Sequence, residues 1–340
     1  MAYRYSGEQH DLFRPVEGAE FEVSQGERRL RIFISGKRQG SDHFCAILAE
    51  NVRRWGYEVE VITAATMRDS QRWEGEEGDI VLYDMDALLS HTEVAGSARA
   101  ELASTPGIGL EEIQQNWPRA RLKMLLSSRS VSRRTLERLG VIALLYKPFD
   151  MRVLERYLRV FQRLLYPPFP AEETGGLTRL AIAGKDLLAE GAEGSGEVPP
   201  RVARILIADD QEDVTWGIRQ CLIEQENQRY HYEVKEVHDG LALLEQCVVW
   251  QPHCVVTDLL MPRLNGYQVM RCLASAPGRY RPAFVVISAL MRHEIPVDHS
   301  YLQDQTVRYV NKPFDVEDLL KAVEQELTRI SSQNFGRHGG

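Results

Sequence analysis

The segment HCVVTD, residues 253–258, is a mostly apolar run with β-branched residues that ends at Asp258. A run this short and apolar, without regular polar alternation, is typical of a strand buried on both faces of a parallel sheet. In such sheets, the side chains that do chemistry lie at the carboxyl ends of the strands. We therefore expect Asp258 at the functional edge of a parallel sheet.

Strands and helices alternate on both sides of this segment. Strands are expected at residues 204–208, 231–237, 253–258, 283–288 and 307–310, and helices at 213–225, 240–249, 265–276 and 315–330. This alternation predicts an α/β fold in which helices cover both faces of the sheet.

The first half of the chain repeats this order of elements. Strands are expected at residues 29–35, 57–63, 79–84, 121–127 and 141–146, and helices at 41–55 and 150–165. The chain is predicted to be a tandem duplication of one α/β unit, and its 340 residues are enough for two cores.

A change of composition separates the two halves. Residues 166–200 are dense in Pro, Gly and Glu, which is typical of a linker. Leucines at roughly helical spacing predict one amphipathic helix over residues 177–190 within it. The expected organisation is an N-terminal extension 1–28, a first domain 29–166, a linker 167–202, a second domain 203–330 and a flexible tail 331–340.

Composition excludes several classes of function. The 41 Lys and Arg against 49 Asp and Glu give a net charge of -8, so no nucleic-acid partner is expected without a local basic face. No apolar run is long enough to span a bilayer and the start lacks a signal peptide, so a cytoplasmic protein without membrane insertion is expected. Its 5 cysteines form no C-x-x-C pair, which favours reduced thiols over disulfides or a zinc site.

Three carboxylates are predicted to converge at one edge of the second sheet. Asp209 and Asp210 end its first strand, and Asp258 ends its third. Because like charges repel, these groups need a shared proton or a cation at neutral pH. A hard divalent ion with oxygen ligands, such as Mg²⁺, suits such a site.

Two donors are expected at the same edge, the hydroxyl of Ser288 after the fourth strand and the ammonium of Lys312 after the fifth. Mg²⁺, a hydroxyl, an ammonium and an ionised Asp together suit a transferring phosphoryl group, with the carboxylate as nucleophile.

These residues resemble the receiver domain of two-component response regulators, the family of the chemotaxis response regulator. The motifs that carry the resemblance are ILIADD (205–210), VVTDLLMPRLNG (255–266), VVISA (285–289) and YVNKPF (309–314), and it covers residues 203–330. The resemblance implies tandem flavodoxin-like, doubly wound domains with five-stranded parallel sheets in the order 2-1-3-4-5.

The resemblance also implies residue roles. Asp258 would be the phosphoacceptor, Ser288 and Lys312 catalytic groups, and Ser288 and Tyr309 the switch pair. Mg²⁺ would be bound by Asp210, Asp258 and the carbonyl of Leu260, with Asp209 acting through water. The donor would be a histidine kinase or a histidine phosphotransfer protein.

Two features depart from the family's pattern. Pro296 predicts a short or displaced fourth helix, in a face that the family often uses for dimerisation or partner docking. Leu260 and Leu290 stand where related proteins orient the hydrolytic water, so we expect a long-lived phosphorylated state.

The first half keeps the scaffold and loses most of this chemistry. Ser35, Gly36 and Lys37 replace the acidic pair, whereas Asp84, Ser127 and Lys147 are counterparts of the acceptor, the hydroxyl and the lysine. The interval from Asp84 to Ser127 is 43 positions, against 30 in the second half. We expect a pseudo-receiver whose Asp84 pairs with a lysine and takes no phosphate.

The closing helix of the first half carries a stripe of basic residues, Arg152, Arg156, Arg159 and Arg163. A solvated helical face explains this stripe, and contact with an acidic partner is the alternative.

The leading hypothesis is a phosphorelay response regulator that signals through protein contacts, because no helix-turn-helix, GGDEF-type or other output motif remains. Its receiver would act on its own acyl phosphate rather than on external substrates, and its partners would be a downstream protein or a second copy. The alternatives are a constitutive scaffold and a small-molecule phosphatase. The phosphatase would need an Asp-x-Asp motif, and Asp84-Met85-Asp86 is interpreted as a chance match.

Overall fold

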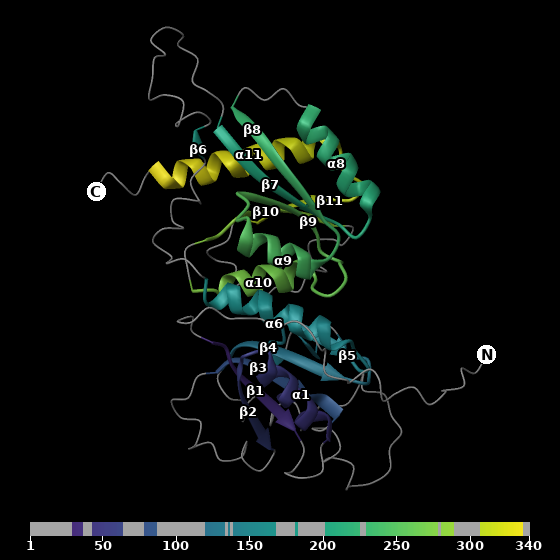
Figure 1. Ribbon diagram of the computed structural model, residues 1–340. Coiled ribbons are helices and arrows are strands. Elements are labelled where there is room, and N and C mark those ends of the chain that lie inside the picture. The colour runs from purple at the N-terminus through teal and green to yellow at the C-terminus, as the bar shows by residue number, and fades with distance from the viewer. Residues whose placement is uncertain are drawn as a thin grey trace, which may run out of the picture. The chain divides into compact units, whose positions relative to one another are not determined.

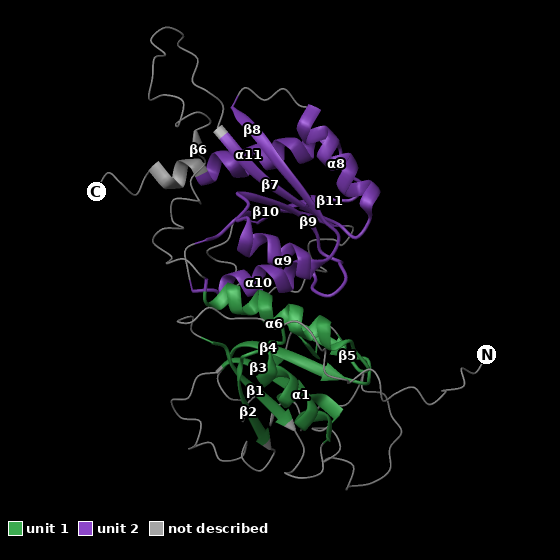
Figure 2. Ribbon diagram, in the orientation of Figure 1, with its two compact units in different colours: residues 1–166 green, residues 167–340 purple. Residues whose placement is uncertain are grey.

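The chain divides after Tyr166 into two units, residues 1–166 and 167–340, in the computed structural model (Figure 2). The structure describes residues 29–36, 43–63, 78–86, 120–132, 135–136, 139–167, 181–182, 201–224, 229–277, 280–288 and 307–335. Each unit is built around its own sheet (Figure 1).

Unit 1 contains a five-stranded parallel sheet in the order β2-β1-β3-β4-β5. Its strands are β1 (Arg31–Gly36), β2 (Glu58–Thr63), β3 (Gly78–Asp84), β4 (Ala120–Ser127) and β5 (Ala143–Tyr146). Its described longer helices are α1 (His43–Arg54) and α6 (Met151–Leu165). Asp150 caps the start of α6 by accepting a hydrogen bond from the backbone N–H of Arg152.

Unit 2 repeats this topology, with the parallel order β8-β7-β9-β10-β11. The elements are β7 (Arg201–Ala208), α8 (Glu212–Glu224), β8 (Tyr230–Val237), α9 (Gly240–Val249), β9 (Cys254–Asp258), α10 (Gly266–Ser275), β10 (Ala283–Ser288), β11 (Val307–Asn311) and α11 (Val316–Phe335). The predicted fold class and the 2-1-3-4-5 strand order are therefore confirmed for both units.

The inner strands of unit 2, β7, β9 and β10, are mostly apolar because both faces of the sheet are covered there. Alternate residues, such as Ile205, Val256 and Val285, share one buried cluster with apolar residues of α8 and α11. The intervening residues of β10, such as Phe284, are also fully buried, whereas α9 contacts β7 and packs on α10. Burial of each large aliphatic side chain contributes about 1.5–3 kcal/mol, so this core fixes the strand ends that carry the site.

The short strand β6 corrects the helix predicted over residues 177–190. Its two residues, Ala181–Ile182, are the described part of that segment, and they pair antiparallel with Val202 and Arg201. The partner β9 joins β7 only from Ile205 onward, so the first residues of β7 leave a free edge that β6 fills. Sequence periodicity gives no information about that open edge.

Two predicted boundaries also move. Strand β7 begins at Arg201, inside the predicted linker, and α11 continues to Phe335, inside the predicted flexible tail. No Gly or Pro interrupts α11 before Gly336, which explains its extension. The fourth helix expected around Pro296 and the helical linker beyond β6 lie outside the described residues. In the part of the chain that the structure describes, no helix has the length and apolarity needed to cross a membrane.

Candidate functional site

Two carboxylates of unit 2 meet on one ammonium. The Nζ atom of Lys312 lies 2.9 Å from Oδ2 of Asp209 and 2.7 Å from Oδ2 of Asp258. The two aspartate side chains are 2% and 13% exposed, so little water screens these pairs. The ends of β7 and β9 and the loop after β11 therefore bring together the acid and base groups expected from the sequence.

Strand register explains this convergence. Asp258 pairs with Ile287 across β9 and β10, which places Ser288, buried at the end of β10, one residue beyond that pair. The backbone N–H of Lys312 donates to the carbonyl of Ser288 at 2.9 Å. The hydroxyl-bearing residue and the lysine are thus adjacent, as their strand positions predict.

The ammonium of Lys312 is stabilised in its charged form. Burial alone would lower its pKa, but the hydrogen bonds and charges of Asp258 and Asp209 outweigh burial and raise the pKa above its ordinary value of 10.5. At neutral pH this lysine is a fixed cation between two anions.

The carboxylates suit a cation by their chemistry. Asp209 and Asp258 already direct oxygens at one positive centre, and Asp210 lies exposed on the adjoining turn. Among the described residues, no group of three or more His, Cys, Asp and Glu side chains is arranged to hold a metal ion. In this conformation Lys312 supplies the positive charge between Asp209 and Asp258.

The loop after Asp258 is rigidly attached to the sheet. Its first contact is the N–H of Leu260, which donates to Oδ1 of Asp258 at 3.1 Å. Asn265 and Gln268 form a capping box at the start of α10. A Cβ on Gly266 would lie 2.9 Å from the carbonyl oxygen of Asp258, so glycine permits this close approach. The side chain of Leu260 is 55% exposed.

Tyr309, the expected switch aromatic, is half-buried on β11. Its hydroxyl lies 3.4 Å from that of Tyr267 at the start of α10. Tyr267 itself is 7% exposed, so the ring of Tyr309 has a packed neighbour on the helix that follows the acceptor loop.

The equivalent edge of unit 1 is related to that of unit 2 by strand register. Asp84 pairs with Leu126 next to Ser127, as Asp258 pairs with Ile287 next to Ser288. The N–H of Lys147 donates to the carbonyl of Ser127 at 2.9 Å, as that of Lys312 does to Ser288. The three counterparts named from the sequence therefore occupy equivalent places.

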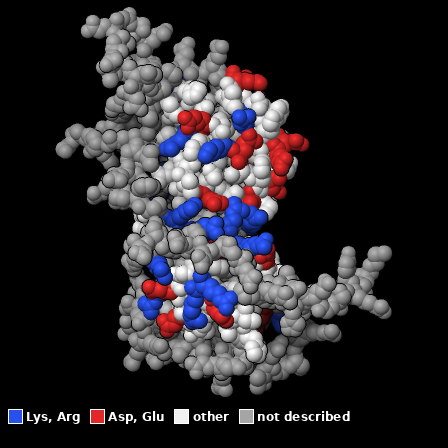
Figure 3. All heavy atoms as spheres, in the orientation of Figure 1, with Lys and Arg blue, Asp and Glu red and all other residues white. Residues whose placement is uncertain are grey.

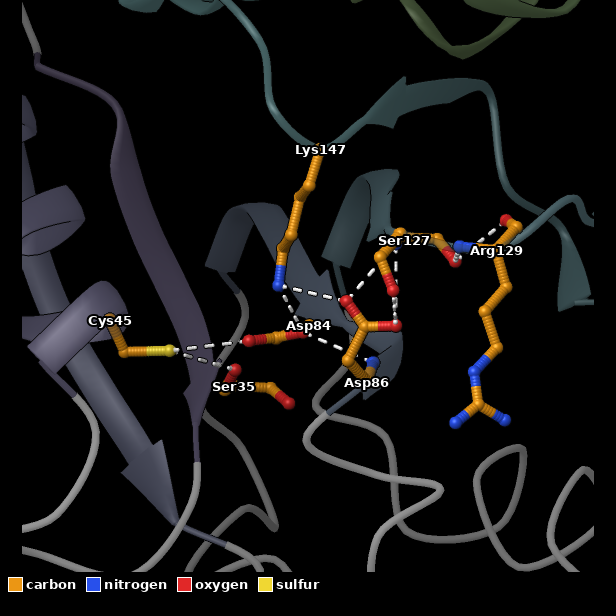
Figure 4. Close-up of polar contacts among 8 residues, drawn as sticks. Ser35, Cys45, Asp84, Asp86, Ser127, Arg129 and Lys147 are labelled. Atoms are coloured by element: carbon orange, nitrogen blue, oxygen red, sulfur yellow. Dashed lines mark hydrogen bonds and ion pairs between the residues drawn. The ribbon is translucent and has the colours of Figure 1, made fainter. Parts of the chain in front are cut away.

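In the first unit, Lys147 is the lysine that pairs with Asp84 (Figure 4). Its Nζ atom is 2.6 Å from Oδ1 of Asp84 and 3.3 Å from Oδ2 of Asp86. Gly36 ends β1 at the position of Asp209, so the second carboxylate comes from Asp86 instead. The counterpart of Asp210, Lys37, lies outside the described residues.

Two details of this edge differ from the sequence interpretation. The hydroxyl of Ser127 donates to the carbonyl of Arg129 at 2.9 Å and accepts from its N–H at 3.1 Å. The neighbouring Ser128 instead donates to Asp86. The motif at 84–86, interpreted as a chance match, thus contains a residue of the site. The sequence signal for this role of Asp86 is an acidic residue two positions after the counterpart of the acceptor.

An acidic residue on α6 itself offsets part of the positive charge of the arginine stripe. Arg159 pairs with Glu155 at 2.7 Å, whereas Arg152 and Arg163 are exposed. On the face drawn in Figure 3, Lys and Arg side chains of both units lie among Asp and Glu side chains.

Comparisons with known proteins identify the second unit. Residues 205–324 match the response regulator receiver domain family. This stretch of unit 2 is a response regulator receiver domain, a module of two-component signalling, and such domains typically bind Mg²⁺ and imply a cognate histidine kinase. Unit 1 forms a second sheet of the same topology.

Similar curated proteins include the response regulator MprA of Mycobacterium ulcerans (strain Agy99), 32% identical over 131 residues, which are 38% of this chain and 53% of that protein. MprA of Mycobacterium tuberculosis (strain ATCC 25618 / H37Rv) is 30% identical over the same shares. The chain thus spans about half the length of these relatives. Among solved structures, the receiver domain of Francisella response regulator 1452 is 20% identical, with a TM-score of 0.30, over 37% of this chain and 98% of that one.

Proposed function

We propose that the chain is a phosphorylation-controlled signalling protein in which Asp258 accepts a phosphoryl group from a histidine kinase or a histidine phosphotransfer protein. The observation that carries this proposal is the position of the Asp258 carboxylate, 2.7 Å from the Lys312 ammonium at the edge of a receiver domain. The neighbouring Ser288 supplies a hydroxyl at the same edge.

In the proposed reaction, a carboxylate oxygen of Asp258 attacks the phosphorus of a phosphohistidine. The new P–O bond forms as the P–N bond breaks, and the imidazole nitrogen keeps the electron pair. Lys312 offsets the negative charge of the transferred group, and the hydroxyl of Ser288 donates a hydrogen bond to it. Catalysis by this edge is positioning and charge neutralisation.

The residues that would hold Mg²⁺ are Asp209, Asp210, Asp258 and the carbonyl of Leu260. When bound, the ion would supply charge neutralisation of the phosphoryl oxygens. The convergence of two carboxylates on one cationic centre supports this ligand set.

A protein partner suits the surface around this edge. Trp216 on α8, Leu260 in the acceptor loop and Val316 at the start of α11 follow the carboxyl ends of β7, β9 and β11, and they are 61%, 55% and 40% exposed. Exposed apolar side chains near a reactive carboxylate favour docking of a protein donor over a small molecule alone.

Output would pass through protein contacts, with a downstream protein or a second copy as partner and unit 1 as a pseudo-receiver. The switch would involve Ser288 and Tyr309, whose ring would follow the hydroxyl as it turns toward the phosphoryl group. Receiver domains are generally cytoplasmic, and we propose the same location here.

The deciding experiment is labelling with acetyl phosphate, with and without Mg²⁺, on the wild type, Asp258→Asn and Asp84→Asn. We expect Mg²⁺-dependent label in the wild type and in Asp84→Asn, and none in Asp258→Asn, which keeps the side-chain volume. Asp210→Ala should also abolish the Mg²⁺-dependent gain in thermal stability. Stable label in Asp258→Asn would refute the acceptor assignment, and no label in the wild type would favour a constitutive scaffold.

A further inference from the structure

Three donors at the functional edge of unit 1 contact one side chain, Asp86, and Figure 4 shows this carboxylate between Lys147 and the end of β4. The backbone N–H of Ser128 lies 3.1 Å from Oδ2 of Asp86, and its hydroxyl lies 2.8 Å from Oδ1. The ammonium of Lys147 lies 3.3 Å from Oδ2. A backbone amide, a hydroxyl and an ammonium therefore surround a single carboxylate.

The same donors would serve a phosphoryl group on Asp84. Lys147 bonds the carboxylate of Asp84 at 2.6 Å, and Ser128 follows the hydroxyl position at the end of β4. The N–H of Asp86 donates to Oδ1 of Asp84 at 3.1 Å, as that of Leu260 donates to Asp258. The acceptor carboxylate is thus held as in unit 2, but the space beside it contains an anion of the chain itself.

We propose that unit 1 contains an anion-binding site of phosphoryl type that Asp86 fills from within, so that the edge is held in an anion-bound arrangement without any external anion. The position two residues after the acceptor decides the difference between the units. Unit 2 has the apolar Leu260 there, which offers no carboxylate to the donors of its edge, whereas unit 1 has a carboxylate that engages them.

The surroundings of Lys147 support this assignment. Its Nζ atom lies 4.0 Å from the centroid of the Phe44 ring, which holds the ammonium beside both carboxylates. Burial would raise the pKa of Asp86, but its hydrogen bonds to Ser128 and the charge of Lys147 outweigh burial and lower it. Asp86 is therefore an anion at neutral pH.

An internal carboxylate competes strongly with a free anion. It is tethered two residues from Asp84, so its effective concentration at the donors is far above that of a metabolite. A free anion would bind only in the fraction of molecules from which Asp86 has withdrawn, and its apparent affinity falls by that fraction. Removal of the carboxylate should expose the site.

The test is a calorimetric titration of the full chain with inorganic phosphate, carried out on Asp86→Asn and on Asp86→Ala. Every sample also carries Asp258→Ala, so that the acceptor edge of unit 2 is altered in the same way in all of them. We expect both Asp86 variants to bind phosphate at least tenfold more tightly than the chain with Asp86 intact. Addition of Lys147→Met should abolish this gain in affinity. The matched control is Glu50→Gln, which removes one exposed negative charge from α1 and should leave phosphate binding unchanged.

A folded Asp86→Asn chain with unchanged phosphate affinity would overturn the proposal. A second measurement on the otherwise unaltered chain covers the case in which both Asp86 variants fail to fold. The NMR resonances of the Asp86 carboxyl group and the Lys147 ammonium group should not shift at phosphate concentrations that saturate exposed sites. A shift would show that phosphate reaches the donors in the presence of Asp86, and it would overturn the proposal. Because these readouts involve unit 1, they are independent of labelling at Asp258.

Discussion

Replacement of Lys312 by methionine tests the charge balance of the unit 2 site. The two Oδ2 atoms that share its ammonium lie 2.9 and 2.7 Å from Nζ, so they are at most 5.6 Å apart. Without the cation, two carboxylates at this distance repel by about 3 kcal/mol at an effective dielectric constant of about 20. In the wild type the ammonium offsets this repulsion, and its removal leaves the repulsion uncompensated.

The expected result for Lys312→Met is a loss of about 3 kcal/mol in the unfolding free energy of unit 2, or roughly 10 °C in its melting temperature. Mg²⁺ should recover part of this loss, because it replaces the missing positive charge. The measurement is calorimetry of the full chain, fitted with one transition for each unit. Lys321→Met is the matched control, because its exposed pair with Glu317 at 3.8 Å contributes less than about 1 kcal/mol. Equal melting temperatures for the two variants would refute the reasoning.

Three further predictions concern unit 2. The raised pKa of Lys312 means that its stabilisation is complete below about pH 10 and is lost as pH rises through the folded pKa, so the melting difference between wild type and Lys312→Met should shrink as pH rises above about 10. Gly240→Ala should cost about 3 kcal/mol or more, because its Cβ would lie 1.8 Å from a backbone oxygen of the acceptor loop. Gly217→Ala should stabilise the protein by about 0.5–1 kcal/mol, because no atom lies within 4 Å of the added Cβ. Equal changes in unfolding free energy for the two glycine variants in denaturant titrations would contradict this geometry. Leu260→Asn with Leu290→Glu should shorten the lifetime of the phosphorylated protein in a label-decay assay, and equal or slower decay would disprove the shielding role of the leucines.

The fold could be predicted because the strands of a covered parallel sheet are short apolar runs. The strand predicted at AFVVIS, residues 283–288, has the same bounds as β10 in the structure, and every residue of it is buried. The predicted helix at 177–190 failed at Ala181–Ile182 because the free edge of β7 is a tertiary feature that helical spacing does not report.

The site was predictable to the extent that strand ends converge. Asp209, Asp258 and Lys312 follow three strands whose carboxyl ends share one edge, so their meeting followed from topology. The role of Asp86 could not be predicted in this way, because its partner Ser128 lies 42 residues away along the chain. A count of charges around each lysine gives the missing clue, since Lys147 lacks a carboxylate from β1 to match Asp209.

The different origin of the second carboxylate constrains how the two units could interconvert during evolution. An aspartate introduced at Gly36 would place a third anion around Lys147, whereas loss of Asp86 alone would leave the lysine with one partner. The step that adds an aspartate while Asp86 is present is the costly one, because three carboxylates would share one lysine. A restored acidic pair in unit 1 would therefore begin with the loss of Asp86, which leaves Asp84 and Lys147 as a neutral pair, and only then gain an aspartate at the end of β1.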